Sequence, residues 1–371
     1  MAVKKDTDGS WFARVSYKDK QTGKYKTKSQ YGFKRKKDAD QWERSKKNDL
    51  EKGFNIGANP YFFDYYSKWV ETYKTSPNVA VRTQNNYLTT MNIIKNYFEH
   101  TPIKSINKMN YQAFLNDLSI KNAISTNQKI NKHIRACLKD ALEDGLVPKD
   151  FTQGVTVAGK PVQAEEEKFL SEAEMKKLLL EIRNGMNDQT TTRWMALIQF
   201  AGGLRYSEVA GLTYDDFKSQ TLRINKAWSF AEKKHVPTKN ELKRTIKIEP
   251  SIAAEFKSYI LRQKKNNLKS GISNKDKLVF ISSSDSPPTH AAMNKSLKRA
   301  CKRADIKEIT SHALRHTHVS LLIYHGMDIV SISKRIGHKS PTTTIEKYSH
   351  VINELEHRND EISDKMIASF L

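Results

Sequence analysis

The sequence predicts a mainly α-helical protein with small β elements (the α+β class), divided into three domains. Three observations support this prediction. An alternating apolar segment near the N-terminus is followed by apolar residues at helical spacing, and a β-hairpin pattern interrupts the helical patterns of the last part of the chain. The predicted limits are 1–57 for a small sheet with one helix, 58–152 for a helical bundle, 153–168 for a linker, and 169–371 for a mixed α and β-hairpin domain with a tail helix.

The net charge of the chain favours a polyanionic partner. Its 371 residues include 64 Lys and Arg against 41 Asp and Glu, a formal charge of +23. Such an excess favours nucleic acid, with an anionic membrane surface as the alternative. No run of about 20 apolar residues predicts a membrane span, and no apolar core of a signal peptide is apparent. Cys137 and Cys301 are too few for a disulfide framework or a four-cysteine zinc site, and both are expected in the core.

The first predicted domain combines a sheet with dense positive charge. Residues 1–57 hold 16 Lys and Arg against 8 Asp and Glu. Apolar residues at period two predict a strand with one buried face. They are Trp11, Ala13, Val15 and Tyr17. The segment YKTKSQYGF is expected to return as one or two further strands, and KRKKDADQWERSKKNDLEKG as a helix ended by Gly53. This composition suits DNA binding, and a solvated lysine-rich face is the alternative.

The second predicted domain is a small bundle of amphipathic helices with a basic side. One helix carries an apolar stripe at positions i, i+4, i+7 and i+11, formed by Tyr87, Met91, Ile94 and Phe98. Another carries Ile130, Ile134, Cys137, Leu138 and Leu142. The opposite face of that second helix is expected to be basic and exposed. Its residues are Lys129, Lys132, His133, Arg135 and Lys139.

The third predicted domain begins sharply after the linker. Gly, Pro and acidic residues without a sustained period mark the linker, and Ser171 and Glu174 then have the spacing of a helix capping box. Further on, alternating apolar pairs predict a hairpin-like region between helical patterns. The pairs are Leu222 with Ile224 and Ile246 with Ile248.

Six of the 11 histidines lie between His312 and His350, which makes this region chemically unusual. His312 and His316 have the spacing by which one helix offers two imidazoles to zinc. However, Ala313 occupies the position where metalloproteases carry the general-base Glu, and Arg315 would place a fixed cation beside the metal. The sequence therefore disfavours a metal site, and we expect neither a metal nor another cofactor.

A phosphate site accounts for the same residues better. The planar guanidinium of arginine donates to two oxygens at once, and His312 and Arg315 share one helix face at spacing i, i+3. Arg205 follows two glycines, His338 follows another, and Tyr348 lies on a short helix. A tyrosine hydroxyl near two arginines is a candidate nucleophile, because cations stabilise both phenolate and a pentacoordinate phosphorus. Each residue alone is most often an ordinary surface or core residue, but the ordered set is specific.

This ordered set resembles the catalytic domain of the tyrosine recombinases, the integrase family. The resemblance lies in GLRYSEVAGL, SHALRHTH, IGHKS and IEKYSH, between residues 169 and 350. Residues 60–150 resemble the family's helical core-binding domain through weaker motifs. The N-terminal segment resembles the arm-type DNA-binding domain of integrases from phages and conjugative transposons. The resemblance implies a site-specific recombinase (integrase) of a phage or integrative conjugative element, which is a DNA strand transferase.

The resemblance also implies the residues of the site. They are Arg205, Lys239, His312, Arg315, His338 and Tyr348. The family's hairpin lysine falls on Lys239 in PTKNELKRTI, with Lys243 as the alternative. His312 would either assist proton transfer at the tyrosine or hold the phosphate, and Glu208 is expected to support Arg205.

The reaction implied is a transesterification through a 3′-phosphotyrosyl intermediate. Tyr348 would attack the scissile phosphate while Arg205, Arg315 and His338 stabilise the non-bridging oxygens, and Lys239 would protonate the departing 5′-oxygen. Strand exchange would pass through a Holliday junction. The implied partners are double-stranded DNA with core and arm-type sites, three further copies of the chain in a tetramer, an excisionase and a host DNA-bending protein. The implied location is the cytoplasm of a bacterial cell, at the nucleoid, with no membrane partner.

Three histidines and the C-terminal tail have no role in the reaction implied by the resemblance. His316, His318 and His350 are expected to pack or to form hydrogen bonds. The tail is expected to form a helix that either closes its own core or, by the resemblance, docks on a neighbouring subunit; its apolar residues are Ile352, Leu355, Ile362, Met366, Ile367 and Phe370.

Three alternative functions were considered. A DNA-binding protein without cleavage activity has no need of a tyrosine among phosphate-holding cations, and a metal-dependent transposase or nuclease needs clustered carboxylates. A topoisomerase would share the chemistry.

Overall fold

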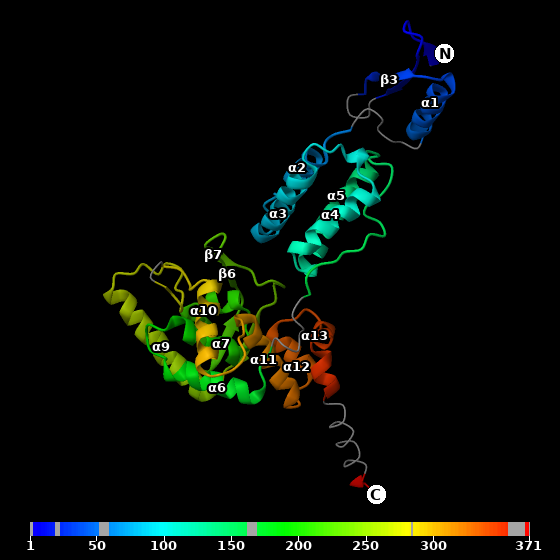
Figure 1. Cartoon of the computed structure of the whole chain (residues 1–371). Helices are drawn as coiled ribbons and strands as arrows, with labels where there is room; N and C mark the ends of the chain where they lie inside the picture. The colour runs from blue at the N-terminus through cyan, green and yellow to red at the C-terminus, as the bar shows by residue number, and fades with distance from the viewer. Residues whose placement is uncertain are drawn as a thin grey trace. The chain divides into compact units, whose positions relative to one another are not determined.

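A computed structural model describes residues 3–18, 23–51, 59–161, 169–282, 285–354 and 368–370 of the chain. The chain forms two compact units, Met1–Val162 and Gln163–Leu371 (Figure 1). Small sheets accompany many helices, as the predicted fold class requires. The predicted limits of the three domains stay a prediction, and each unit is described separately.

The first unit begins with a three-stranded antiparallel sheet in the order β1-β2-β3. Its strands are β1 (Val3–Lys5), β2 (Trp11–Lys18) and β3 (Tyr25–Phe33), and α1 (Lys36–Glu51) follows them. The alternation along β2 is confirmed, since Ala13 and Val15 are buried, and Ala13 shares a small core with Ala39 of α1. The segment after the turn forms one strand, and β1 was not predicted. Gly53, the expected end of the helix, lies outside the described residues.

The helical part of the first unit has a core of its own. It consists of α2 (Phe62–Tyr73), α3 (Val81–Phe98), a short 3-10 turn at Ile103–Ser105, α4 (Lys108–Lys121) and α5 (Ile124–Glu143). The two predicted stripes on α3 and α5 are confirmed, because Ile94, Phe98, Ile130 and Ile134 are all buried in this core.

His133 was expected on the exposed basic face of α5, and this expectation is wrong. The side chain is buried, its ring stacks on Tyr87 with centroids 4.0 Å apart, and Nδ1 lies 2.8 Å from the Thr90 hydroxyl. Burial, followed by the charge of Lys129, lowers the pKa of His133 to about 4. The imidazole is therefore a neutral part of the core at pH 7. The basic side of α5 consists of its lysines and Arg135, without His133.

The first part of the predicted linker packs against the bundle. The amide of Gln112 exchanges hydrogen bonds with the main chain of Thr156, and Asn127 donates to the carbonyl of Ala158 over 2.8 Å. Two valines of this segment, Val155 and Val157, pack against the helical core. Residues 162–168 lie outside the described part of the chain.

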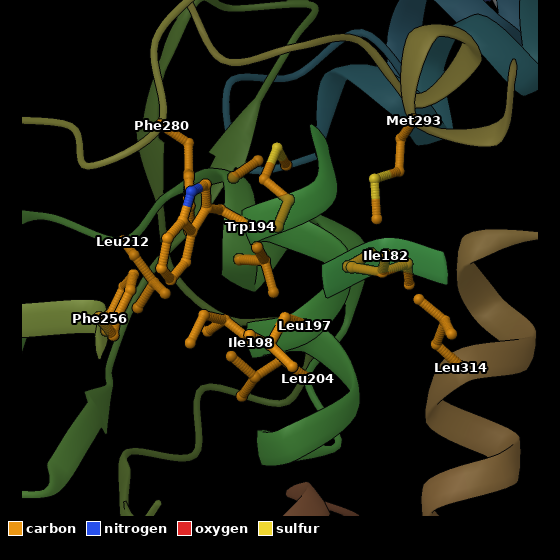
Figure 2. Packing of buried hydrophobic residues seen from close by; sticks show 14 of the residues in the cluster. Ile182, Trp194, Leu197, Ile198, Leu204, Leu212, Phe256, Phe280, Met293 and Leu314 are labelled. Carbon is orange, nitrogen blue, oxygen red and sulfur yellow. The ribbon is translucent and has the colours of Figure 1, made fainter. Parts of the chain in front are cut away.

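The second unit surrounds α7, a mostly buried helix (Figure 1). Its helices are α6 (Glu172–Asn184), α7 (Thr191–Gly202), α8 (Tyr206–Ala210), α9 (Pro250–Lys269), α10 (His290–Arg303), α11 (Ser311–Tyr324), α12 (Ile329–Ile336) and α13 (Pro341–Glu354). The predicted capping box at Ser171 and Glu174 starts α6. Figure 2 shows side chains of α7, among them Trp194 and Leu197, within a cluster that also includes Phe256 and Leu314.

Two small sheets lie between α8 and α9 in the chain. One has the order β4-β5-β8, with β4 (Phe217–Lys218), β5 (Thr221–Ile224) and β8 (Arg244–Lys247), and the other pairs β6 (Ala227–Ser229) with β7 (Lys234–Val236). The predicted pairing is confirmed, because Leu222 lies opposite Ile246 and both side chains are buried. The sequence did not reveal the additional β6–β7 hairpin inserted between the two predicted strands.

A separate apolar cluster joins α11, α12 and α13. Its buried members are Val319, Ile323, Ile332, Ile336, Tyr348 and Val351. Tyr348 thus belongs to a packed core rather than to an open surface. Most of the predicted tail helix, residues 355–367, lies outside the described residues. Both cysteines are buried, as expected, and no helix among the described residues has the length and apolar character that crossing a bilayer requires.

Candidate active site

Arg205 and Arg315 lie on different elements but converge on one turn of the second unit. Arg205 precedes α8, and Arg315 lies on α11, 110 positions along the chain. Arg205 Nη2 donates to the carbonyl of Gly337 over 3.1 Å, and Arg315 Nη2 donates to the carbonyl of Ile336 over 2.8 Å. The two guanidinium groups therefore bind consecutive carbonyls at the end of α12. Such terminal carbonyls carry partial negative charge, which attracts cations.

Arg315 is held rigidly because its surroundings are closed. Only 3% of the residue is exposed, and Nη1 donates to the carbonyl of Gly203 over 2.7 Å. Gly203 ends α7 with a φ of +62°, and a Cβ there would lie 2.5 Å from the His318 ring, so only glycine fits. Burial, then the charge of Arg205, lowers the pKa of Arg315 to about 9, which leaves the guanidinium charged at pH 7.

Glu208 is the buried counter-ion of this site. Its side chain is 1% exposed, and it accepts from Arg205 Nη1 over 2.8 Å and from the backbone N–H of Arg205 over 2.9 Å. Arg244 of β8 donates to both carboxylate oxygens, over 3.1 and 2.7 Å. Burial alone would raise the pKa of Glu208, but hydrogen bonds from Arg244 and the charges of the arginines lower it to about 2. Glu208 therefore supports Arg205, as expected, and it stays ionised.

His338 follows Gly337, whose φ of +70° ends α12 in the left-handed conformation. Its Nδ1 lies 2.8 Å from the hydroxyl of Thr344. Burial, then the charges of Arg315, Lys347 and Arg205, lowers the pKa of His338 to about 3. The imidazole is neutral at pH 7 and close enough to both predicted arginines to sense their charges.

Tyr348 points into the cluster of α11 to α13. The residue is 2% exposed, and its hydroxyl lies 2.8 Å from Nδ1 of His316. The helix α13 departs from helical geometry at this residue, with φ −122° and ψ 18°. His312, which is exposed, contacts the His316 ring edge-on with centroids 4.6 Å apart. The imidazole on the Tyr348 hydroxyl is therefore that of His316. His312 was expected either to assist proton transfer at the tyrosine or to hold the phosphate.

Lys239 lies in an exposed turn between β7 and β8. Its neighbour Asn240 donates to the Gly337 carbonyl over 3.1 Å, so this carbonyl accepts from Asn240 and from Arg205. The turn thus carries Lys239 to the end of α12. Lys243, the alternative, is also exposed and directly precedes Arg244 on β8.

Among the described residues that contact the site, Asn240, Arg244, His316 and Thr344 were not predicted as members of it. His316 was expected only to pack or to form a hydrogen bond, which it does with Tyr348. The buried His318 accepts from Arg335 Nε over 3.2 Å, as expected for a structural histidine, and the side chain of His350 lies outside the described residues. Within the described ranges, no group of three His, Cys, Asp or Glu residues could hold a metal ion.

Models of three protein families match the chain in order. The Arm DNA-binding domain matches residues 1–50, the phage integrase N-terminal SAM-like domain matches 61–119, and the Phage integrase family matches 168–354, more than half of the chain.

Two of the curated proteins with similar sequences are named integrases. The chain is 27% identical over 333 residues to the integrase of Staphylococcus phage L54a, covering 82% of this chain and 93% of that protein. It is also 27% identical over 212 residues to the ICEBs1 integrase of Bacillus subtilis, covering 56% of each.

Several solved structures with the same fold are integrases bound to DNA. The Tn1549 transposon integrase with transposon right end DNA has a TM-score of 0.65 and 19% identity, covering 80% of this chain and 99% of that one. A lambda integrase dimer bound to a COC′ core site has a TM-score of 0.61 and 14% identity, covering 93% and 94%. At these identities the likeness shows the fold, whereas the family model shows the family. The chain belongs to the phage integrase family of tyrosine recombinases.

Proposed function

We propose that this chain is the integrase of a phage or integrative conjugative element, and that it cuts and rejoins DNA through Tyr348. The observation that carries this proposal is the convergence of Arg205 and Arg315 on the consecutive carbonyls of Gly337 and Ile336. A phosphodiester group bound at the same place would accept from both guanidinium groups, since its non-bridging oxygens are stronger acceptors than carbonyls. His338 belongs to this turn itself, and Tyr348 comes from α13, the helix that follows the turn.

The chemistry proceeds by displacement at phosphorus. The Tyr348 oxygen bonds to the scissile phosphorus, and the bond to the 5′-oxygen breaks, which leaves a 3′-phosphotyrosyl link and a free 5′-hydroxyl. The proton of the tyrosine hydroxyl passes to His312 or to water, and Lys239 supplies a proton to the departing 5′-oxygen. Because the protein–DNA bond retains the energy of the phosphodiester, religation needs no ATP. A 5′-hydroxyl of a second duplex reverses the step and exchanges the strands through a Holliday junction.

The cations of the site stabilise the transition state. The phosphodiester carries one negative charge and the pentacoordinate transition state two, and Arg205 and Arg315 bind the oxygens on which the second charge develops. His338 is neutral in the free protein. In the tautomer with the proton on Nε2, Nδ1 accepts from the Thr344 hydroxyl and Nε2 donates to the phosphate. His312 is exposed beside these groups and either holds the phosphate or assists the tyrosine proton.

Cleavage requires Tyr348 to change its surroundings. In the free protein the hydroxyl is buried against His316, where a duplex cannot reach it. The interrupted helical geometry at Tyr348 lies at the residue that has to move. We infer that binding of DNA moves α13 enough to bring the hydroxyl to the phosphate.

The proposed partners follow from the domain matches and the charge of the chain. Lambda integrase has been solved as a tetramer on a Holliday junction, and we propose that this chain acts as a homotetramer on core and arm-type sites. An excisionase and a host DNA-bending protein are proposed as further partners. The activity would take place on DNA in the cytoplasm of a bacterial cell.

A covalent-adduct assay tests this function. The wild-type chain is incubated with a nicked duplex taken from the DNA that flanks its gene, where the attachment site of the element is expected, and protein–DNA adducts are separated on a denaturing gel. The wild type should form an adduct that Tyr348→Phe does not form, although the variant binds the duplex with a Kd within about threefold, since one hydroxyl is removed.

The controls separate the alternatives. An unchanged adduct in Tyr348→Phe would reject Tyr348 as the nucleophile. Tight binding with no adduct in the wild type would indicate a DNA-binding protein without cleavage activity. Cleavage that disappears in excess EDTA would indicate a metal-dependent nuclease or transposase.

A further inference from the structure

Arg244 lies where three segments of the candidate site meet. It begins β8, five positions after Lys239, and its side chain is 8% exposed. Besides its two hydrogen bonds to Glu208, its Nε donates to the carbonyl of Arg335 over 2.7 Å. The side chain therefore connects the hairpin of Lys239, the counter-ion of Arg205 and the end of α12.

The end of α12 is bound by arginines on three successive carbonyls. Arg244 binds the carbonyl of residue 335, Arg315 that of residue 336, and Arg205 that of residue 337. Arg244 also fits closely under the turn, since a Cβ on Gly337 would lie 2.8 Å from its Nη1. The position of the turn that presents His338 is thus fixed partly by Arg244.

Arg244 also determines how much charge Arg205 can offer to a phosphate. Glu208 carries one negative charge, and without Arg244 that charge would be neutralised mainly by Arg205. With Arg244 on both carboxylate oxygens, three arginines surround one carboxylate, which leaves an excess of two positive charges. This excess of two positive charges matches in magnitude the two negative charges of the pentacoordinate transition state.

We propose that Arg244 is a positioning residue of the recombination reaction: it neutralises Glu208 and fixes the Gly337 turn, so that Arg205 and His338 meet the phosphate with full charge and correct spacing. This inference rests on the proposed function and extends it to a residue that does not itself touch DNA. It separates the rate of the chemical step, which depends on Arg244, from the affinity for DNA, which does not.

Arg244→Lys and a matched control test the proposal. Lys keeps the positive charge, but a single ammonium cannot bind both oxygens of Glu208 and the Arg335 carbonyl together. The control is Lys247→Gln, which removes a charge from the opposite face of the same strand, where the side chain is exposed. For each protein, the Kd for the nicked duplex and the single-turnover rate of adduct formation at saturating DNA are measured.

Arg244→Lys is expected to bind with a Kd within about threefold of wild type and to form the adduct about 100-fold more slowly at saturation, because displacement of about 1 Å at a reacting centre costs that much. Lys247→Gln should keep the wild-type rate at saturation. An Arg244→Lys rate within threefold of wild type, or a loss confined to Kd, would overturn the proposal. A wild type that forms no adduct would instead reject the proposed function.

A second measurement needs no DNA. The carboxyl group of Glu208 is titrated by NMR in full-length wild type and in Arg244→Lys, and loss of the bidentate contact should raise its pKa toward the ordinary value of 4.5. Near-ultraviolet circular dichroism checks that the variant is folded. An unchanged Glu208 pKa, or a variant that does not fold, would overturn the positioning role, the latter because Arg244 would then be a folding residue.

Discussion

Replacing Glu208 by Gln should reveal the buried ion cluster as a pH-dependent contribution to stability. The carboxyl is 1% exposed, and contacts with Arg244 and Arg205 lower its pKa from 4.5 to about 2. A difference of this size corresponds to about 3 kcal/mol of folding free energy. Because the folded pKa lies below the unfolded one, this contribution is fully present above about pH 4.5 and disappears as the pH falls through about 2.

Urea unfolding of the full chain measures this contribution. Unfolding is followed by tryptophan fluorescence at several pH values between 7 and 2. The buried Trp194 and Trp228 report on the second unit, and Trp11, Trp42 and Trp69 report on the first. Glu208→Gln has no carboxyl to titrate, so the free energy of unfolding of wild type minus variant isolates this group. The difference should shrink by about 3 kcal/mol between pH 7 and pH 2, mostly below pH 4.5.

Two results would contradict a lowered pKa of Glu208 in the folded protein. A difference that stays constant with pH would show that Glu208 has the same pKa in the folded and unfolded chain. A difference that grows as the pH falls would show that burial outweighs the arginines and that Glu208 is protonated in the folded protein. A matched control, Glu255→Gln, removes a carboxylate that is about 40% exposed and paired with Arg183, and it should change the stability by less than about 1 kcal/mol.

Three further predictions concern the turn, the hairpin and the binding of DNA. Gly337→Ala should destabilise the protein by roughly 1–2 kcal/mol in thermal unfolding, because φ is +70° and the new methyl would lie 2.8 Å from Arg244 Nη1; an unchanged Tm would contradict this geometry. Lys239→Ala should slow cleavage by about 10²-fold or more, and a duplex with sulfur in place of the 5′-bridging oxygen should restore the rate, because a thiolate leaves without a proton. The same loss and rescue in Lys243→Ala, with none in Lys239→Ala, would transfer the role of acid to Lys243. Affinity for DNA, measured by fluorescence anisotropy, should fall by about 10³-fold from about 50 to about 200 mM salt, and a flat dependence would reject charge as its main source.

Many elements of the fold could be predicted, because they depend on residues that are close together in the sequence. The stripes on α3 and α5, the alternation on β2 and the capping box of α6 depend on residues within one or two turns of each other. His133 shows where this reasoning fails. Its partners Tyr87 and Thr90 are more than 40 residues away, so nothing in the local pattern indicated that a polar residue among lysines would be buried.

The residues of the candidate site also fall into a group that the sequence predicted and a group that it did not. Its arginines, histidines and tyrosine could be proposed from motifs, and the structure brings Arg205, Arg315 and His338 to one turn. The contacts that support these residues could not be predicted, because each contact joins segments that are distant in the sequence. Arg244 meets Glu208 from 36 positions away, and His316 meets Tyr348 from 32. A lone Arg on an alternating strand, or a second His in a motif, is indistinguishable from a surface residue until the partner is known.

The structure of Tyr348→Phe bound to its own attachment-site duplex tests most directly whether Arg205 and Arg315 hold one phosphate. We predict that the guanidinium nitrogens of both arginines lie within about 3 Å of the non-bridging oxygens of one and the same phosphate, with the substituted ring at position 348 turned away from His316. Two arginines that bind different phosphates, or that remain on the carbonyls of Ile336 and Gly337 while DNA passes elsewhere, would contradict it.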